Sequence, residues 1–270
     1  MNLFGEKIRF QSFGSGSSGN CYFIGNQKYG ILIDAGLSAR AIRKNLKNIS
    51  LDVKNIRAVF VTHDHNDHIK GICALGEHFL IPIFATSETH SGIEKNNCTQ
   101  KLDRSKCILY KGKSVEVEDF KVTAFPVCHD ATDSVGYFVE FCGKTFTFAT
   151  DLGEIGYDAS KYLQSANYII LEANYDEDML QNGNYPVLLQ NRIRAATGHL
   201  SNEQAAIFLS ENLSENWEKI FLCHLSKENN TKELAVQTVE NYLLKNNKFK
   251  EKDIEIVALN RTLPSKLYFL

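Results

Sequence analysis

The stretch Thr62-His63-Asp64-His65-Asn66-Asp67-His68 follows the apolar run Ala58 to Val61 and combines three imidazoles with two carboxylates. Because side chains alternate along an extended chain, His63 and His65 are expected to face one point. A turn at Asn66 would let Asp67 and His68 face a second point. Imidazole and carboxylate ligands without thiolate suit zinc or manganese, with iron or nickel as further candidates. The stretch therefore predicts a loop that supplies ligands to two divalent metal ions. A surface cluster without function is the plainer alternative.

Residues that can bind a metal or move a proton also follow other predicted strands. Six strands end in, or run directly into, such a residue: Asp34, His63, His129, Asp151, Glu172 and His224. Strands that end at one edge of a layered sheet bring such side chains together even when they are far apart in the sequence. The sequence therefore predicts a single site assembled from strand ends.

Short apolar runs alternate with segments of helical periodicity along the chain, and no repeat or long linker interrupts them. About thirteen strands are predicted from this pattern. The predicted helices are Ala39 to Leu46, Ile69 to Glu77, Tyr157 to Leu163, Val187 to Ala196, Asn202 to Leu213 and Lys232 to Leu244. A capping box of Ser201 and Gln204 marks the start of the fifth helix. The pattern favours an α/β fold of two sheets flanked by helices.

Length and composition bound the alternatives. A chain of 270 residues with 43% apolar composition favours one domain over two. A formal net charge of -2 creates no global field for nucleic acid, so a polyanionic partner must be held by a local basic patch or by bound metal. The seven cysteines form an odd set without a C-x-x-C pair, which argues against a disulfide framework.

The sequence lacks the signals of export and of membrane insertion. Residues 1–20 contain no apolar segment of the kind found in signal peptides. No run approaches the roughly 20 apolar residues that a membrane-spanning helix needs. We therefore expect a cytoplasmic protein without a membrane partner, and the sequence leaves its oligomeric state open.

The histidine stretch resembles the H-x-H-x-D-H signature of the metallo-β-lactamase superfamily, and further motifs of that superfamily match in order across essentially the whole chain. The matching positions are Asp34 in Ile33-Asp34-Ala35-Gly36, His129, Asp151 in Ala149-Thr150-Asp151, and His224 in Cys223-His224-Leu225-Ser226. The resemblance implies a four-layer αββα sandwich in which two mixed sheets are flanked by helices.

The same resemblance implies a set of ligands for each of two metal positions. One ion would be held by His63, His65 and His129, and the other by Asp67, His68 and His224, with Asp151 bridging the two. Asp34 would orient the histidine loop through hydrogen bonds rather than touch a metal.

Two further stretches, Leu171-Glu172-Ala173-Asn174 and Gly198-His199-Leu200-Ser201, resemble motifs of the tRNA 3′-processing endonucleases of this fold. That likeness implies that His199, oriented by Glu172, protonates the leaving oxygen of a phosphodiester. The segment between the two stretches is too short for the tRNA-clamping arm of those enzymes. Residues 1–270 are accordingly predicted to form a single domain with no inserted second domain.

The chain is most similar to the bacterial YycJ-like group, also called WalJ-like. The residues that carry this likeness are Gly14 to Asn20, Asp67-His68-Ile69-Lys70-Gly71, His129-Asp130-Ala131, Val135-Gly136-Tyr137, Gly198 to Asn202 and Cys223 to Asn230. The group implies exonuclease action on DNA from the 5′ end, with a suspected role in DNA repair.

These observations lead to the hypothesis of a binuclear metal-dependent phosphodiesterase, with a metal-bridging hydroxide as nucleophile. Asp67, His199 and Glu172 are the predicted catalytic residues. A phosphodiesterase for a small cyclic substrate, another hydrolase of this fold, and a catalytically silent metal-binding protein are the alternatives.

A glycine-rich turn and two further histidines carry weaker signals. Ser17, Ser18 and Asn20 are candidates for contact with a substrate phosphate, although a glycine-rich turn between strands is structurally ordinary. His78 and His90 have no partner motif and are predicted to be surface residues.

Overall fold

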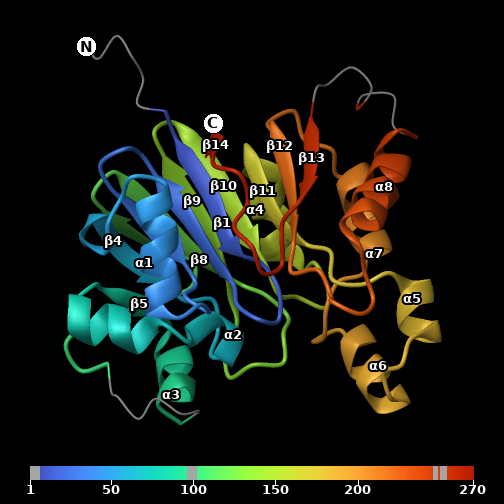
Figure 1. Ribbon diagram of the computed structural model, residues 1–270. Coiled ribbons are helices and arrows are strands. Elements are labelled where there is room, and N and C mark those ends of the chain that lie inside the picture. Colours follow the sequence, from blue (N-terminus) through green and yellow to red (C-terminus); the bar gives the residue numbers. More distant parts are fainter. Residues whose placement is uncertain (1–6, 96–101, 246–248, 250–253) are drawn as a thin grey trace.

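Two mixed sheets of seven strands each pack face to face in the computed structural model (Figure 1), which describes residues 7–95, 102–245, 249 and 254–270. The first sheet has the order β14 (Tyr268–Phe269), β1 (Arg9–Gly14), β2 (Cys21–Gly25), β3 (Gly30–Ile33), β4 (Ile56–Phe60), β5 (Ile83–Ala85) and β6 (Lys106–Ile108). The second sheet has the order β13 (Glu255–Ala258), β12 (Lys219–Cys223), β11 (Tyr168–Glu172), β10 (Lys144–Ala149), β9 (Val135–Phe141), β8 (Phe120–Pro126) and β7 (Ser114–Val117).

Each sheet is antiparallel in one part and parallel in the other. In the first sheet β1, β2 and β3 pair antiparallel, whereas β3, β4, β5 and β6 are parallel. In the second sheet β7 to β10 pair antiparallel, whereas β10 to β13 are parallel. Because parallel strands all end at the same edge, each sheet collects several loops at one edge.

Aromatic side chains from both sheets fill the space between them. The rings of Phe10 and Phe221 lie 4.7 Å apart between centroids, and those of Tyr22 and Phe148 lie 5.7 Å apart. All four side chains are fully buried. Burial of each such side chain contributes about 1.5–3 kcal/mol, so this interface is the main energetic link between the sheets.

Helices cover the outer faces of both sheets (Figure 1). The helices over the first sheet are α1 (Ala39–Asn48), α2 (Asn66–Ile69) and α3 (Ser87–Lys95), with the short turns η1 (Val53–Asn55) and η2 (Ala74–His78). The helices over the second sheet are α4 (Tyr157–Ser165), α7 (Asn202–Glu211) and α8 (Lys232–Leu243). A separate pair, α5 (Glu177–Asn182) and α6 (Val187–Arg194), lies beyond the layers around a small cluster of its own.

The predicted α/β sandwich of two mixed sheets flanked by helices is confirmed, as is the capping box that begins α7. The prediction of one helix from Ile69 to Glu77 is wrong. There the chain forms α2 and then a π-helical turn, because the N–H of Gly71 leaves the helix pattern to bond the carbonyl of Ala35. Helix α3 and the two-residue strand β14 were not predicted.

The prediction that His90 is a surface residue is also wrong. His90 belongs to α3 and its side chain is buried, with its Nε2 3.0 Å from the carbonyl oxygen of Cys107. His78 is exposed, as predicted. No disulfide joins any two of the six cysteines in the described ranges, and Cys98 lies outside them. Within the same ranges, no helix has both the length and the apolar character needed to cross a bilayer.

Candidate metal centre

The loops that follow six strands meet at one end of the sandwich. The predicted residues come directly or within three positions after β3, β4, β8, β10 and β12, and Glu172 is the last residue of β11. The prediction that these residues follow strands is therefore correct. The strands belong to both sheets, so the site lies between two sheet edges rather than along one.

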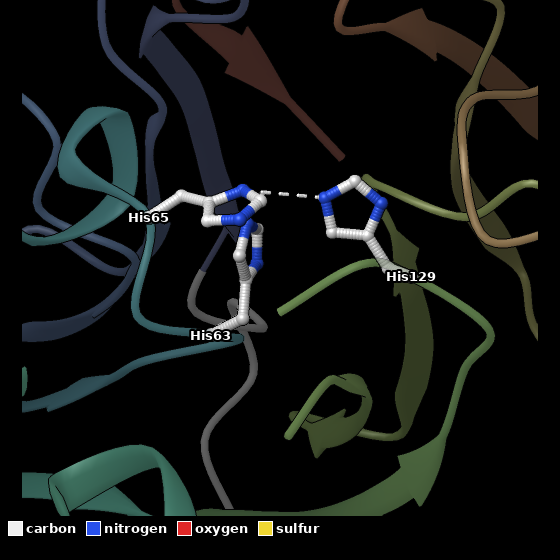
Figure 2. A group of neighbouring side chains, drawn as sticks. All are labelled: His63, His65 and His129. Carbon is white, nitrogen blue, oxygen red and sulfur yellow. Dashed lines mark hydrogen bonds between the residues drawn. The ribbon is translucent and has the colours of Figure 1, made fainter. Parts of the chain in front are cut away.

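Three histidines form the first group of donors (Figure 2). His63 and His65 project from the loop after β4 toward His129, which comes from the loop after β8. One donor atom of each lies within 4.8 Å of the others, and His129 Nε2 is 3.3 Å from His65 Nδ1. His129 is held in place through its Nδ1, which lies 3.0 Å from the carbonyl oxygen of Gly198. This leaves Nε2 of His129 directed at the group.

Asp67, His68 and His224 form the second group of donors, again with atoms within 4.8 Å of one another. Helix α2 begins after His65, so Asp67 and His68 lie in its first turn. His68 Nε2 and His224 Nε2 lie 3.5 and 3.6 Å from Asp67 Oδ2. His224 has a left-handed backbone conformation with a φ of 52°, which turns its side chain away from the strand direction of β12.

Asp151 belongs to two further donor groups that include residues of the first two. It forms one group with His63 and His68, and another with Glu172, His199 and His224. Its carboxylate oxygens lie 3.3 Å from His68 Nε2, 3.1 Å from His224 Nδ1 and 4.0 Å from His129 Nε2. The structure thus brings all seven predicted ligands together, with Asp151 between the two sets.

A layer of buried hydrogen bonds orients the donors of the histidine loop. Asp34 Oδ2 lies 2.7 Å from His68 Nδ1, and the same carboxylate accepts the backbone N–H and the hydroxyl of Thr62. Asp34 is in no donor group, in keeping with the predicted orienting position. Gly36 permits the close contact beneath the loop, because a Cβ there would lie 1.6 Å from the carbonyl oxygen of Asp67.

The charges of the site fit bound cations. Burial by itself disfavours protonation of His224, but Asp151, Asp67 and Glu172 raise its pKa to about 10. Burial by itself would raise the pKa of the Asp151 carboxyl, yet His224 and His68 hold it well below its ordinary value. Without metal, protons on imidazoles balance the carboxylates, and a metal ion competes for the same nitrogens.

Three of the buried ligand atoms of this site lack a hydrogen-bond partner: His63 Nε2, His224 Nε2 and Asp151 Oδ2. Asp151 Oδ2 is 3.3 Å from His68 Nε2 but without the geometry of a hydrogen bond. Unpaired polar atoms at full burial are costly, and coordination to a divalent ion would satisfy all three. The donor set therefore fits a metal centre of imidazoles and carboxylates.

Glu172 and His199 lie beside this centre. Glu172 is fully buried, and its Oε1 is 2.7 Å from His199 Nδ1 and 2.9 Å from His224 Nδ1. Its Oε2 accepts the backbone N–H groups of Leu152 and Leu200. A single carboxylate thus orients a ligand imidazole and the partly exposed imidazole of His199.

A cavity of about 160 Å³ opens onto these groups. Its lining residues are Ser17, His65, Asp67, Asp130, Asp151, Leu189, Arg192, Ile193, Gly198, His199 and His224. Asp67, Asp151 and His224 of the metal centre and the imidazole of His199 are therefore accessible from one opening.

The three candidates for phosphate contact have different positions. Ser17 lines the cavity, and Ser18 is exposed in an adjoining one. Asn20 is fully buried, and its amide lies 3.2 Å from Asp67 Oδ2 and 2.9 Å from His68 Nε2. The prediction for Asn20 is corrected: its side chain is buried and braces the ligand loop instead of lining the cavity.

Four residues of the site were not assigned a role from the sequence. The hydroxyl of Ser15 accepts the N–H of His224, and the amide of Asn174 donates to the carbonyl of His224. At the opening, Arg192 Nε donates to Asp130 Oδ2 at 2.6 Å. Ser15, Asn174 and Asp130 lie within stretches that resemble the family, but their contacts depend on the fold.

Comparisons with known proteins identify the family of the chain. Residues 29–213 match the profile of a family described as the beta-lactamase superfamily domain. The chain therefore belongs to the metallo-β-lactamase superfamily and is a metal-dependent hydrolase of that fold. It is 35% identical over 237 residues to the exodeoxyribonuclease WalJ of Streptococcus pneumoniae. The aligned residues cover 87% of this chain and 88% of that protein.

A second relative extends the likeness over nearly the full length. The chain is 30% identical over 263 residues to the exodeoxyribonuclease YycJ of Bacillus anthracis, covering 97% of this chain and 99% of that protein. The predicted membership of the WalJ- and YycJ-like group is confirmed. Among solved structures, the metallo-β-lactamase fold protein YhfI of Bacillus subtilis has a TM-score of 0.67 at 14% sequence identity. The superposition covers 96% of this chain and 99% of that chain. This likeness supports the fold alone.

Proposed function

We propose that this chain is a nuclease that hydrolyses phosphodiester bonds of DNA with two divalent cations, digesting from the 5′ end. The observation that carries the proposal is Asp151, whose carboxylate lies between two groups of donors beside the Glu172–His199 pair. The relatives named exodeoxyribonuclease support DNA as the substrate class. We also infer that residues 1–270 act as one domain.

In this proposal each donor group holds one cation. The first cation is held by His63, His65 and His129, the second by Asp67, His68 and His224, and Asp151 contributes to both. Bound there, divalent cations of the zinc or manganese type lower the pKa of an attacking water and neutralise charge that grows on the phosphate.

The protein side chains then move the protons. Glu172 occupies Nδ1 of His199, so Nε2 is the nitrogen left to donate a proton to the departing oxygen. Burial by itself lowers the pKa of His199, but Glu172 reverses this effect and raises it, which favours the protonated donor. Asp67 lines the cavity, where its carboxylate would orient the attacking water.

Metal analysis combined with digestion of end-labelled DNA and RNA tests the proposal. We expect about two ions per chain and release of nucleotides from the 5′ end of DNA. One ion per chain at full activity would contradict the binuclear part, and release from the 3′ end would contradict the polarity. Exclusive digestion of RNA would contradict the substrate.

The small size of the cavity favours one alternative, a phosphodiesterase for a small cyclic substrate, because the same donors and the same proton donor would serve it. A competition assay between duplex DNA with a 5′ phosphate and small cyclic phosphates separates the two. The nuclease proposal requires DNA to inhibit cyclic hydrolysis, and it fails if cyclic phosphates are cleaved while DNA neither competes nor is cut.

A further inference from the structure

Helix α6 exposes three consecutive apolar side chains. Val187 is 68% exposed, Leu188 84% and Leu189 36%. Within the described ranges, no other three consecutive large apolar residues are all exposed. We call these three residues the α6 ridge. Runs of exposed apolar residues are unfavourable in water unless another molecule covers them, so the ridge indicates a contact surface.

The α6 ridge is attached to the metal centre. Leu189 and Ile193 of α6 line the catalytic cavity together with His199 and His224. The backbone N–H of His199 donates to the carbonyl of Ile193 at 2.9 Å. Figure 1 shows α6 outside the layers of the sandwich, at the end of the molecule where α2 lies. A ligand in the catalytic cavity would therefore extend toward this helix.

The cavity is too small to enclose a nucleotide with its neighbours. Its volume of about 160 Å³ is below the roughly 300–1,000 Å³ of pockets that enclose a drug-sized ligand. Only the phosphate to be cleaved and its immediate surroundings would enter. The bases on either side of that phosphate would have to lie on the surface around the opening, where the α6 ridge is.

The surroundings of the opening also match the two sides of a nucleic acid strand. An adjoining cavity of about 540 Å³ shares Ser17 with the first and is lined by Tyr185, from the loop before α6, and by the cationic Arg261 and Lys227. Lys227 pairs with its neighbour Glu228, whereas Arg261 has no carboxylate partner among the residues described. An apolar edge beside a cationic one suits bases on one side and phosphates on the other.

We propose that the α6 ridge is a nucleobase-binding surface, against which the terminal bases of the DNA strand pack while the adjacent phosphate enters the metal centre. Aliphatic side chains that wedge between bases are an established way to unstack a duplex, and here they would hold its end open. This inference rests on the proposed nuclease function and specifies how that site recognises DNA.

Leu188→Ser tests the proposal, because Leu188 is the most exposed residue of the ridge and does not line the catalytic cavity. The substrates are duplex DNA, the same duplex with abasic nucleotides at its 5′ end, and bis(4-nitrophenyl) phosphate. We expect kcat/KM for intact DNA to fall about tenfold, the order of a lost base contact. The abasic duplex should abolish the difference between variant and wild type, and the ratio of activities on DNA and the small ester should fall.

Leu244→Ser is the matched control, because Leu244 is 48% exposed and follows the last turn of α8. Since β12 and β13 are parallel, α8 leads from the carboxyl end of β12 back to the opposite end of the sheet. This variant should cleave all three substrates like wild type.

Each remaining outcome is decisive. If Leu188→Ser lowers cleavage of both DNA and the small ester in parallel, α6 is structural and the proposal is wrong. Equal effects of Leu188→Ser on intact and abasic duplex would also overturn it, since no base contact would then be involved. If wild-type protein cleaves the small ester but not DNA, the nuclease function itself fails, and the ridge proposal fails with it.

Discussion

The two halves of the metal centre are built in different ways. The loop half supplies His63, His65, Asp67 and His68 from within six consecutive residues. The strand half supplies its groups from loops and strand ends spread over nearly a hundred residues, namely His129, Asp151, Glu172, His199 and His224. The loop half is therefore determined over a short range, whereas the strand half exists only once the second sheet has formed.

The supports of the two halves differ accordingly. The loop half depends on Asp34, Thr62 and the close approach of Gly36 to Asp67. The strand half depends on contacts between distant segments, such as the bond from His224 N–H to the Ser15 hydroxyl, two hundred and nine positions apart. Substitutions in the loop half should therefore have local effects. Substitutions in the strand half should test whether the two halves act as one site.

Asp151→Asn should have the largest effect, because Asp151 belongs to the strand half and its carboxylate also lies 3.3 Å from His68 of the loop half. The amide keeps the shape but removes the charge and one acceptor, so we expect loss of metal from both positions and a fall of about 10³-fold in hydrolysis of bis(4-nitrophenyl) phosphate. Metal content by mass spectrometry checks this. A variant that keeps two ions and full activity would show that Asp151 does not join the halves.

His199→Gln should separate chemistry from metal binding within the strand half. We expect the ion content of wild type, with cleavage of DNA lowered about 10²–10³-fold because the leaving oxygen lacks its proton donor. Bis(4-nitrophenyl) phosphate, whose leaving group needs no proton, should be cleaved at nearly the wild-type rate. Loss of metal, or an equal loss on both substrates, would assign His199 to the ligands instead.

Gly36→Ala should damage the loop half through folding. The added methyl would meet the carbonyl oxygen of Asp67, and neither backbone can give way easily, so we expect a loss of about 3 kcal/mol in the free energy of unfolding. Urea denaturation measures it. Gly156→Ala is the control, because nothing lies within 4 Å of a Cβ there, and its stability should match wild type. Equal stabilities of the two variants would contradict the close packing beneath the loop.

Asp34→Asn should have the smallest of these effects. The carboxylate that orients His68 is replaced by an amide that cannot accept all of its present hydrogen bonds, and we expect metal affinity to fall about 10–100-fold. Competition with a chelator measures this affinity. Asp64→Asn is the matched comparison in the same loop, since Asp64 accepts bonds from Thr132 rather than holding a ligand imidazole. Affinity should fall less there, and the reverse order would refute the orienting position of Asp34.

The difference between the halves also explains which elements could be predicted. Helices with a regular apolar stripe, such as α1 with Ile42 and Leu46 buried, follow from periodicity. Helix α3 carries no such signal, because it buries Thr89, His90 and Gly92 together with a single large apolar residue, Ile93. Strand β14 consists of two residues whose pairing with β1 depends on the path of the whole chain.

The sequence by itself determined the chemistry of the site: which donors exist, that they follow strands, and to which superfamily they belong, because side-chain identity and short-range periodicity are local properties. Only the tertiary structure decided that Asn20 braces the ligand loop, that His90 is buried and that α6 borders the opening. Those facts depend on how two sheets pack and on contacts between residues far apart along the chain, which no local pattern encodes.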